Sequence, residues 1–377
     1  MDIICKAEQC TGCAACMNRC PKKCIEMHED SIMGHLHPII DHTKCVDCGA
    51  CKKVCPANSP LNLQKPLTAY AGWDKSESEY ESSTSGGAAS AFARYVIRQG
   101  GVVYGCAMMP GIEVRHIRID TEYDIRLLKG SKYVQSTIGD VYSKVREDLR
   151  QDRKVLFIGT PCQVAGVKSF IGERIAGNLY TVDLICHGTP SLAFLRRHIL
   201  KKTKGVVPDE IFFRKGAYLL LLLLLLGGKE IYRSSLFEQR YQDIYYNAFF
   251  DGFSYRDSCN TCRYAQPNRV SDVTIGDFWG LDEDFPLEHP HGCSVLLPTT
   301  EKGMVLIDGI RSEFNLFERS VDEAVNGNEQ LRNPKKKNFR IKVFRKILPL
   351  FGIDKSYRLC MFDKIIKRNL RIIIKGK

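Results

Sequence analysis

The sequence predicts a small cysteine-rich α+β domain over residues 1–65, a larger α/β domain with a mainly parallel sheet over residues 66–330, and a helical basic tail over residues 331–377. Three observations lead to this fold class. Ten of the 17 cysteines lie within the first 65 residues. From about residue 88 onward, strand-like apolar runs alternate with helical runs, as in parallel βαβ units. Residues 331–377 carry 16 Lys or Arg against two acidic residues.

The composition indicates an ordinary globular protein with an unusual use of cysteine. A chain of 377 residues suffices for two or three domains, and a hydrophobic content of 44% is typical of folded proteins. The N-terminus carries no basic stretch followed by an apolar segment and a cleavage site. We therefore expect a cytoplasmic protein, in which regularly spaced cysteines usually bind metal rather than form disulfides.

The first domain contains a repeated cysteine motif. Residues 10–21 read CTGCAACMNRCP and residues 45–56 read CVDCGACKKVCP. This C-x-x-C-x-x-C-x-x-x-C-P pattern is the signature of bacterial ferredoxins with two 4Fe-4S clusters, in which the fourth cysteine of each motif binds the other cluster. Structural zinc also accepts four cysteines, but zinc motifs do not explain eight cysteines in this crossed pattern. We expect one cluster on Cys10, Cys13, Cys16 and Cys55, a second on Cys45, Cys48, Cys51 and Cys20, and packing roles for Cys5 and Cys24.

The larger domain is predicted from its alternating segments. A helix starts near Ala88, and an eight-leucine run at residues 219–226 is too short to span a bilayer, which needs about 20 residues. The expected strands cover residues 100–108, 154–159, 179–186, 210–215, 229–235, 272–278 and 293–299, with the fourth and fifth paired. The expected helices between them cover residues 138–152, 162–172, 190–202 and 236–250.

Two polar segments of this domain suit an anionic group. In TSGGAASAF, Gly86 and Gly87 precede a helix, where free backbone N–H groups can bind a phosphate. The loop LKGSKYVQS at residues 128–136 combines two lysines, two serines and a tyrosine, although a solvated loop has the same composition. No G-x-G-x-x-G follows the first strand of the domain, which disfavours a Rossmann dinucleotide site.

Four further cysteines lie in motifs. Cys162 and Cys186 each follow a predicted strand, and Cys259 and Cys262 form the C-x-x-C of CNTC. If the CNTC loop folds over the strand ends, four thiolates meet, which suits a third 4Fe-4S cluster; structural zinc is the alternative. A nucleophilic pair of Cys186 and His187 is a third interpretation, which is disfavoured because adjacent strand residues point to opposite faces. We expect core or incidental roles for Cys106, Cys293 and Cys360.

Taken in order, the motifs GGAAS, KGSKYVQS, GTPCQ, CHGTPS, CNTC and DVTIGDFWG resemble those of a known family, the beta subunits of coenzyme F-420 hydrogenases and dehydrogenases. The resemblance extends from about Cys10 to about Gln330. It implies an iron–sulfur flavoprotein that passes electrons between ferredoxin-type clusters and an organic acceptor, which in archaea can be F-420. It also implies FAD on the α/β domain, near Gly86, Gly87, Ser90, Lys129, Ser131, Tyr133 and Gln135.

Three functions are compatible with these features. The first is a flavin-dependent oxidoreductase with a redox partner protein or reduced carrier as electron source and a small-molecule acceptor. The second is a non-catalytic subunit that delivers electrons to a larger enzyme complex, and the third is a scaffold with structural zinc. No catalytic residue is assigned; His187, Lys132 and Asp277 are candidates for a general acid.

The tail concentrates the positive charge of the protein. Residues 331–377 have a net charge of +14 within a chain of +12, so the preceding residues sum to −2. Nucleic acid is therefore not an expected partner, since no recognition motif accompanies this charge. A run of this kind is commonly a solvated or disordered end. Because Lys and Arg alternate with Phe, Ile and Leu, an amphipathic segment on an anionic membrane surface is the second interpretation, with a peripheral location at the inner membrane surface.

Overall fold

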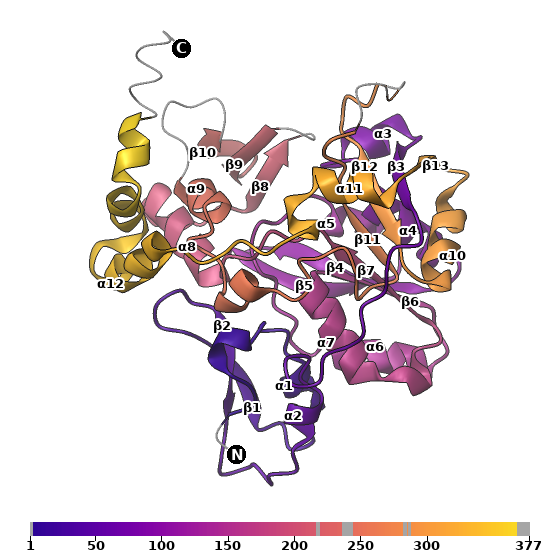
Figure 1. The fold of residues 1–377 in the computed structure, drawn as a ribbon, viewed down its shortest axis with the longest axis horizontal. Coiled ribbons are helices and arrows are strands. Elements are labelled where there is room, and N and C mark those ends of the chain that lie inside the picture. Colours follow the sequence, from indigo (N-terminus) through magenta and orange to yellow (C-terminus); the bar gives the residue numbers. More distant parts are fainter. Residues whose placement is uncertain (1–2, 216–218, 236–243, 282–284, 286–287, 368–377) are drawn as a thin grey trace.

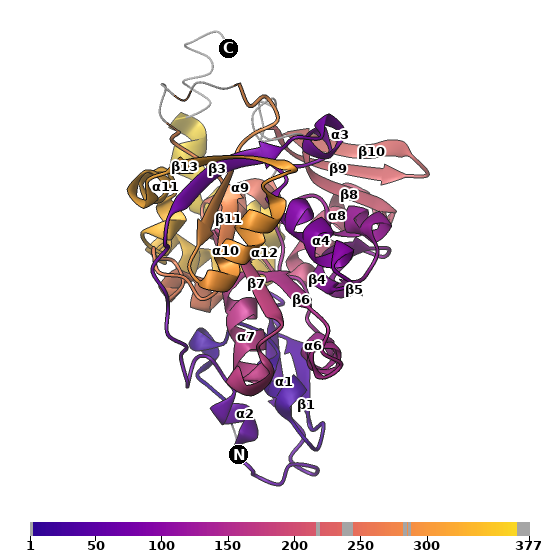
Figure 2. The same cartoon turned by 90° about the vertical axis from the view of Figure 1, so that its right-hand side faces the viewer.

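The computed structural model describes residues 3–215, 219–235, 244–281, 285 and 288–367. A narrow N-terminal lobe, residues 3–65, projects from a wider body (Figure 1). Turning the molecule by 90° shows the same lobe below the body, next to α6 and α7 (Figure 2). The lobe thus contacts one side of the body and leaves its tip in solvent.

The N-terminal lobe contains two short helices and one hairpin. Helices α1 (Ala15–Arg19) and α2 (Ala50–Lys53) each carry the third cysteine of a motif, and each follows a residue in the left-handed region, Ala14 and Gly49. Strands β1 (Ile25–Glu29) and β2 (Leu36–Ile40) pair antiparallel. This arrangement agrees with the predicted small α+β domain.

The body is built on an eight-stranded mixed sheet with the order β13-β3-β12-β11-β7-β6-β4-β5. Four central strands run parallel, and the remaining four pairings are antiparallel. The strands are β3 (Ala69–Asp74), β4 (Val102–Met109), β5 (Glu113–Ile119), β6 (Val155–Gly159), β7 (Leu179–Leu184), β11 (Val273–Asp277), β12 (Ser294–Pro298) and β13 (Phe314–Arg319).

The expectation of a mainly parallel sheet is therefore wrong. The βαβ pattern identified the central strands, but β3, β5 and β13 were not predicted. Parallel neighbours need a crossover connection, whereas β4 and β5 are joined by a short turn at residues 110–112. In the same way, no helix lies between β11 and β12 in the described residues, and these strands pair antiparallel.

Helices cover both faces of the sheet. On one face, α4 (Ala88–Arg98) and α10 (Glu301–Ile310) pack on Val103, Leu156 and Val182. On the other, α6 (Val141–Arg150) and α7 (Pro161–Ile171) pack on alternating residues of the same strands. The other described helices of the body before the tail are α3 (Glu77–Glu81), α5 (Ile125–Leu128), α8 (Leu192–Lys202), α9 (Ile244–Phe250) and α11 (Val321–Gly327).

The leucine run is the central strand of a second sheet. Strand β9 (Leu219–Leu226) pairs antiparallel with β8 (Glu210–Lys215) and β10 (Lys229–Ser235). The two flanking strands were expected to pair with each other, and each instead pairs with β9. Leu221, Leu222 and Leu224 are fully buried, the latter two in one core with residues of α8 and α9. Of the helix expected over residues 236–250, residues 236–243 lie outside the described residues.

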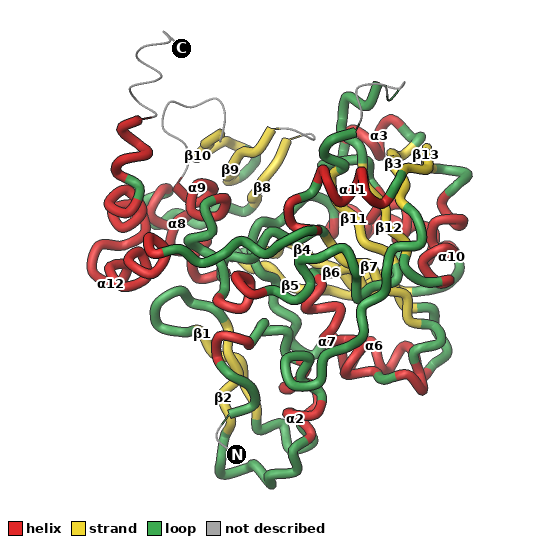
Figure 3. The backbone as a smooth tube through the Cα atoms, viewed as in Figure 1, coloured by secondary structure: helices red, strands yellow, loops and turns green. Residues whose placement is uncertain are grey.

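Helix α12 (Phe339–Cys360), which is kinked, lies at the side of the body (Figure 3). The kink is at Gly352, whose φ is 69°. Arg340 donates to the Cys360 carbonyl at 2.9 Å and pairs with Asp363, so the two arms fold back on one another. A C-terminal helix within the predicted basic tail is thus confirmed, while residues 368–377 lie outside the described residues. Among the described residues, no helix has the length and apolar character needed to cross a membrane.

Candidate iron–sulfur and flavin sites

Two small cavities in the N-terminal lobe are lined by cysteines. The inner cavity, on the side of the body, is lined by Cys10, Cys13, Cys16 and Cys55 together with Cys5. The outer cavity is lined by Cys20, Cys45, Cys48 and Cys51 together with Cys24. Each cavity therefore combines three cysteines of one motif with the fourth cysteine of the other.

The thiols of the inner cavity differ in acidity. Cys5, which donates a hydrogen bond to Cys10, lowers the pKa of Cys10 to about 4, and the nearby Arg256 guanidinium contributes to this shift. Burial raises the pKa of Cys13 to about 11 and also raises that of Cys16. Since thiolates rather than thiols bind iron, these buried groups fit a site in which iron supplies the compensating positive charge.

A third cavity, the body cavity, lies at the edge of the large sheet. It has a volume of about 160 Å³ and is lined by Cys162, Cys186, Cys259 and Cys262, with His187 and two tyrosines. Cys162 is the second residue of α7, directly after β6, and Cys186 follows β7. Because β6 and β7 are parallel neighbours, both cysteines lie at the same edge. The 3-10 turn Asp257–Thr261 and the residue after it contribute the other two.

Burial dominates the chemistry of this cavity. It raises the pKa of Cys186 to about 12 and that of Cys262 to about 11, and it raises the pKa of Cys162 and Cys259 as well. Four half-buried thiols from three segments are a donor set whose chemistry suits a 4Fe-4S cluster or zinc. Within the described ranges, no three His, Cys, Asp or Glu side chains converge closely enough to hold a single metal ion.

A buried ion pair holds the CNTC segment against β7. The Arg269 guanidinium lies 3.0 Å from Asp183, and the two side chains are 1% and 0% exposed. Arg269 also donates to the carbonyls of Tyr264 and Leu184, which follow Cys262 and precede Cys186. Thr274 also contacts this ion pair, because its hydroxyl donates a hydrogen bond to the Asp183 carboxylate over 2.6 Å between the two oxygens. These contacts of Arg269 and Asp183 therefore hold the CNTC segment, with Cys259 and Cys262, against the strand end that leads to Cys186.

The N-terminal lobe approaches the body closely at Gly166, in the middle of α7. A Cβ at this position would lie 3.1 Å from Cys13 Cβ, 3.2 Å from Cys13 Sγ and 2.7 Å from the Tyr142 hydroxyl. Glycine inside a helix costs about 1 kcal/mol relative to alanine. Gly166 lies one helical turn after Cys162, and the close approach of Cys13 explains why a glycine stands at this position.

Arg256 is the second contact between lobe and body. Its guanidinium is buried and donates to the Leu36 carbonyl at 2.9 Å, to the Cys10 carbonyl at 3.3 Å and to the Gln135 side chain at 3.0 Å. Its own carbonyl accepts from the backbone N–H of Cys259. One buried cation therefore contacts the first cysteine motif and the loop that carries the body cysteines.

The residues expected to hold FAD fall into two groups. In the first, Lys129 lies 2.7 Å from the Ser82 hydroxyl, and Ser131 lies 3.0 Å from Thr84. Gly87, in the left-handed region, precedes α4, and no described side chain caps the N-terminus of that helix. Gly86 is tightly enclosed, since a Cβ there would lie 2.1 Å from the Gly72 carbonyl. Ser90 follows on α4 and is buried.

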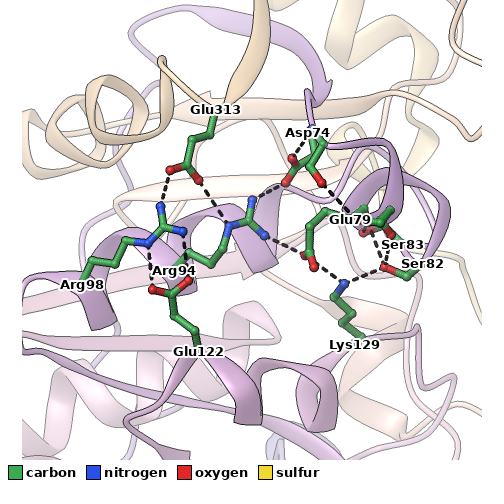
Figure 4. A network of polar contacts seen from close by, with 11 residues as sticks. Asp74, Glu79, Ser82, Ser83, Arg94, Arg98, Glu122, Lys129 and Glu313 are labelled. Atoms are coloured by element: carbon green, nitrogen blue, oxygen red, sulfur yellow. Dashed lines mark hydrogen bonds and ion pairs between the residues drawn. The ribbon is translucent and has the colours of Figure 1, made fainter.

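Lys129, at the end of α5, belongs to an ion-pair network that connects α3, α4, the end of β3 and Glu313 before β13 (Figure 4). It pairs with Glu79 at 2.9 Å, and Glu79 also pairs with the nearly buried Arg94 at 2.7 Å. Arg94 in turn contacts Asp74 and Glu313. The positive charge of Lys129 is thus partly compensated by protein. The free helix end, Lys129 and Ser131 together still offer an anionic group the donors that it needs.

The second group consists of Tyr133, whose side chain also interacts with Ser131, and Gln135, which faces the lobe. The Tyr133 ring packs on Phe213, Tyr246 and Phe249. Gln135 donates to the Thr11 carbonyl at 2.8 Å and accepts from Arg256, so it connects the lobe to the body. The described structure therefore brings Gly86, Gly87, Lys129 and Ser131 together around one turn, and not Gln135.

The three candidate acids have other contacts. Lys132 donates to the carbonyls of Leu128 and Lys129 at the end of α5, and burial lowers its pKa. Asp277 pairs with Arg214 at 2.8 Å. His187 packs against Phe249 and Phe250, and burial lowers its pKa to about 4. Sequence reasoning also missed Gly166, Arg256 and Arg269, because their roles depend on contacts between distant segments that leave no mark in the local sequence.

Comparison with known families agrees with this geometry. Residues 152–323 match the family model that describes the C terminus of the beta subunits of coenzyme F420 hydrogenase/dehydrogenase, and residues 9–59 match the 4Fe-4S dicluster domain. Residues 152–323 thus belong to the C-terminal family of F420 hydrogenase/dehydrogenase beta subunits, and residues 9–59 belong to the 4Fe-4S dicluster domains. The resemblance found in the motifs is thus confirmed, and the N-terminal dicluster domain holds two 4Fe-4S clusters. Members of this family are components of redox enzymes.

Three known proteins are similar to the whole chain or to part of it. One component of the F(420)H(2) dehydrogenase of Methanosarcina mazei is 23% identical over 194 residues, which cover 47% of this chain and 53% of that protein, so the match spans about half the length of this relative. A ferredoxin of Saccharopolyspora erythraea is 35% identical over 77 residues, covering 20% of this chain and 67% of the ferredoxin. A chain of the F420-reducing NiFe hydrogenase complex from Methanosarcina barkeri has 17% identity and a TM-score of 0.48, covering 83% of this chain and 93% of its own length.

Proposed function

We propose that this protein is an iron–sulfur flavoprotein oxidoreductase. In this proposal the two clusters of the N-terminal lobe exchange electrons with a third 4Fe-4S cluster in the body cavity, and this cluster exchanges them with FAD. The observation that carries the proposal is the meeting of Cys162, Cys186, Cys259 and Cys262 around one cavity, next to the lobe that holds the other clusters.

The position of the body cavity supports a redox role over a structural zinc site. A structural zinc needs four thiolates but no neighbouring electron carrier. Here α7 carries Cys162 on one turn and, at Gly166 on the next, contacts the inner-cavity residue Cys13. This proximity is what an electron relay between the two sites requires.

The proposed route starts at the outer cavity. Cys48 is exposed there, whereas Cys10, Cys13 and Cys16 of the inner cavity are buried against the body. Lys22, Lys23, Lys52 and Lys53 are exposed on the lobe, and within the described residues none of them pairs with a carboxylate. A redox partner with an acidic surface would be steered to this end by charge.

FAD is the proposed organic cofactor, and when bound it supplies the conversion between two-electron and one-electron transfer. Lys129, Ser131 and the free N-terminus of α4 would hold its pyrophosphate, because they combine a cation, a hydroxyl and backbone donors. The proposed acceptor is a small organic molecule of the F420 type, since the M. mazei relative is named for F(420)H(2).

Metal and flavin analysis of the full chain, purified without oxygen, tests this function. We expect about twelve irons with as many sulfides, and bound flavin, in the unaltered protein. Cys186→Ala should retain about eight irons and its flavin, because the two domains have separate ligand sets. About eight irons in the unaltered chain, or zinc in place of the missing four, would contradict the third cluster.

A non-catalytic component that only transfers electrons is the second proposal. It is favoured by the contacts of two candidate acids, because Lys132 donates to a backbone carbonyl and Asp277 pairs with Arg214. Turnover of an artificial electron acceptor by the isolated chain separates the two, since only the oxidoreductase would reduce the acceptor without a partner.

A further inference from the structure

The outer side of α12 and of residues 361–367 after it carries an unusual number of exposed apolar side chains. Phe339 and Leu350 are each 77% exposed, Phe362 is 66% exposed and Leu359 is 59% exposed, with Phe351 and Ile366 also exposed. The buried side, with Ile341, Phe344, Leu348, Ile353 and Tyr357, packs on the body. Packing against the body therefore does not explain why the residues on the outer side are apolar.

Basic residues alternate with these apolar ones. In the first arm Phe339, Lys342, Lys346 and Leu350 are spaced by three or four residues and follow one stripe of the helix. Phe351 ends the first arm. In the second arm, after Gly352, Lys355 and Leu359 are four residues apart, and Arg358, Phe362, Lys364 and Lys367 are exposed as well. We name these exposed residues of 339–367 the α12 surface.

The two acidic residues of this segment are neutralised within the chain. Asp354 pairs with Lys201 at 2.9 Å and Asp363 pairs with Arg340. Within the described residues, no carboxylate pairs with the lysines of the α12 surface, so these lysines present a positive potential. In Figure 1 this helix lies at the side of the body, away from the tip of the N-terminal lobe, so both ends of the molecule are accessible at once.

From this combination we propose that the α12 surface binds the surface of a membrane that contains anionic lipids. Phe, Leu and Ile side chains would enter the boundary between headgroups and acyl chains, while the lysines contact the headgroup phosphates and carboxylates. A protein partner fits less well, because the central part of a protein interface is depleted in charged residues, whereas here lysines are interspersed among the exposed apolar residues.

Co-sedimentation of the full chain with lipid vesicles tests the proposal. We expect binding to phosphatidylcholine vesicles that contain phosphatidylserine, weakened by salt, and little binding to phosphatidylcholine alone. Replacing Lys342 and Lys346 together by Gln should weaken binding about 30-fold, since each basic residue near an anionic surface contributes about 1 kcal/mol. Leu350→Ser with Phe351→Ser should weaken binding to the same vesicles.

The control variant also removes two lysines, but from a part of the molecule away from the α12 surface. Lys52→Gln with Lys53→Gln, on the N-terminal lobe, should bind as the unaltered chain does. Unchanged circular dichroism and iron content show that each variant is folded. Equal binding to both kinds of vesicle, equal loss in the control, or self-association without lipid that Leu350→Ser with Phe351→Ser abolishes would overturn the proposal.

Discussion

Replacing Arg269 by methionine removes one partner of the most deeply buried ion pair near the body cavity. Arg269 and Asp183 are 1% and 0% exposed, so the remaining carboxylate would stay in the interior without its cation. Removing one partner of a buried pair costs about 3–5 kcal/mol. At about 2 °C per kcal/mol for a domain of this size, the unfolding temperature should fall by about 6–10 °C.

The same variant should lose iron selectively. Arg269 connects the segment after Cys262 to the strand that leads to Cys186, through the carbonyls of Tyr264 and Leu184. Without it the four cysteines of the body cavity lose their common geometry, while both lobe cavities lie outside this network. Iron analysis should therefore give about eight irons per chain, with the loss confined to the third cluster.

Two further variants serve as controls for Arg269→Met. Arg311→Met removes an exposed pair with Asp308, 50% and 60% exposed, which contributes at most about 1 kcal/mol, so its unfolding temperature should barely change. Asp183→Leu added to Arg269→Met removes the unpaired charge and should restore much of the stability. A fall of less than about 2 °C for Arg269→Met, or iron lost from the lobe, would refute the reasoning.

Three more predictions follow from single contacts. Gly166→Leu should separate the lobe from α7 and reduce the magnetic interaction between the neighbouring reduced clusters in electron paramagnetic resonance; Gly177→Leu, where a Cβ meets nothing within 4 Å, should not. Lys129→Ala with Ser131→Ala should lower flavin content, measured by absorbance, and leave iron unchanged; unchanged flavin would place the pyrophosphate elsewhere. Leu222→Ala should lower the free energy of unfolding by about 2–5 kcal/mol in denaturant titration, since this side chain is fully buried in β9.

Much of the architecture follows from local patterns. The repeated cysteine spacing predicted both lobe cavities, and the βαβ alternation predicted β6 and β7 as parallel neighbours, which is why Cys162 and Cys186 were expected at one edge. Local spacing carries this information because a strand followed by a crossover helix has few ways to return to the sheet.

Other features depend on contacts between distant segments and have no local signal. Strand β3 pairs with β12 and β13, more than 200 residues further along the chain, so the mixed character of the sheet was missed. A buried arginine such as Arg256 has the same sequence signal as an exposed one, and Gly166 gains its meaning only when the lobe is docked on α7.

The central claim is that electrons pass between flavin and lobe through the body cavity. Photoreduction of the bound flavin, followed by electron paramagnetic resonance of the lobe clusters, tests it directly in the unaltered chain and in Cys186→Ala. The account predicts that the lobe clusters become reduced in the unaltered chain, and that in Cys186→Ala the flavin is reduced while those clusters stay oxidised. Equal reduction of the lobe clusters in both proteins would contradict it.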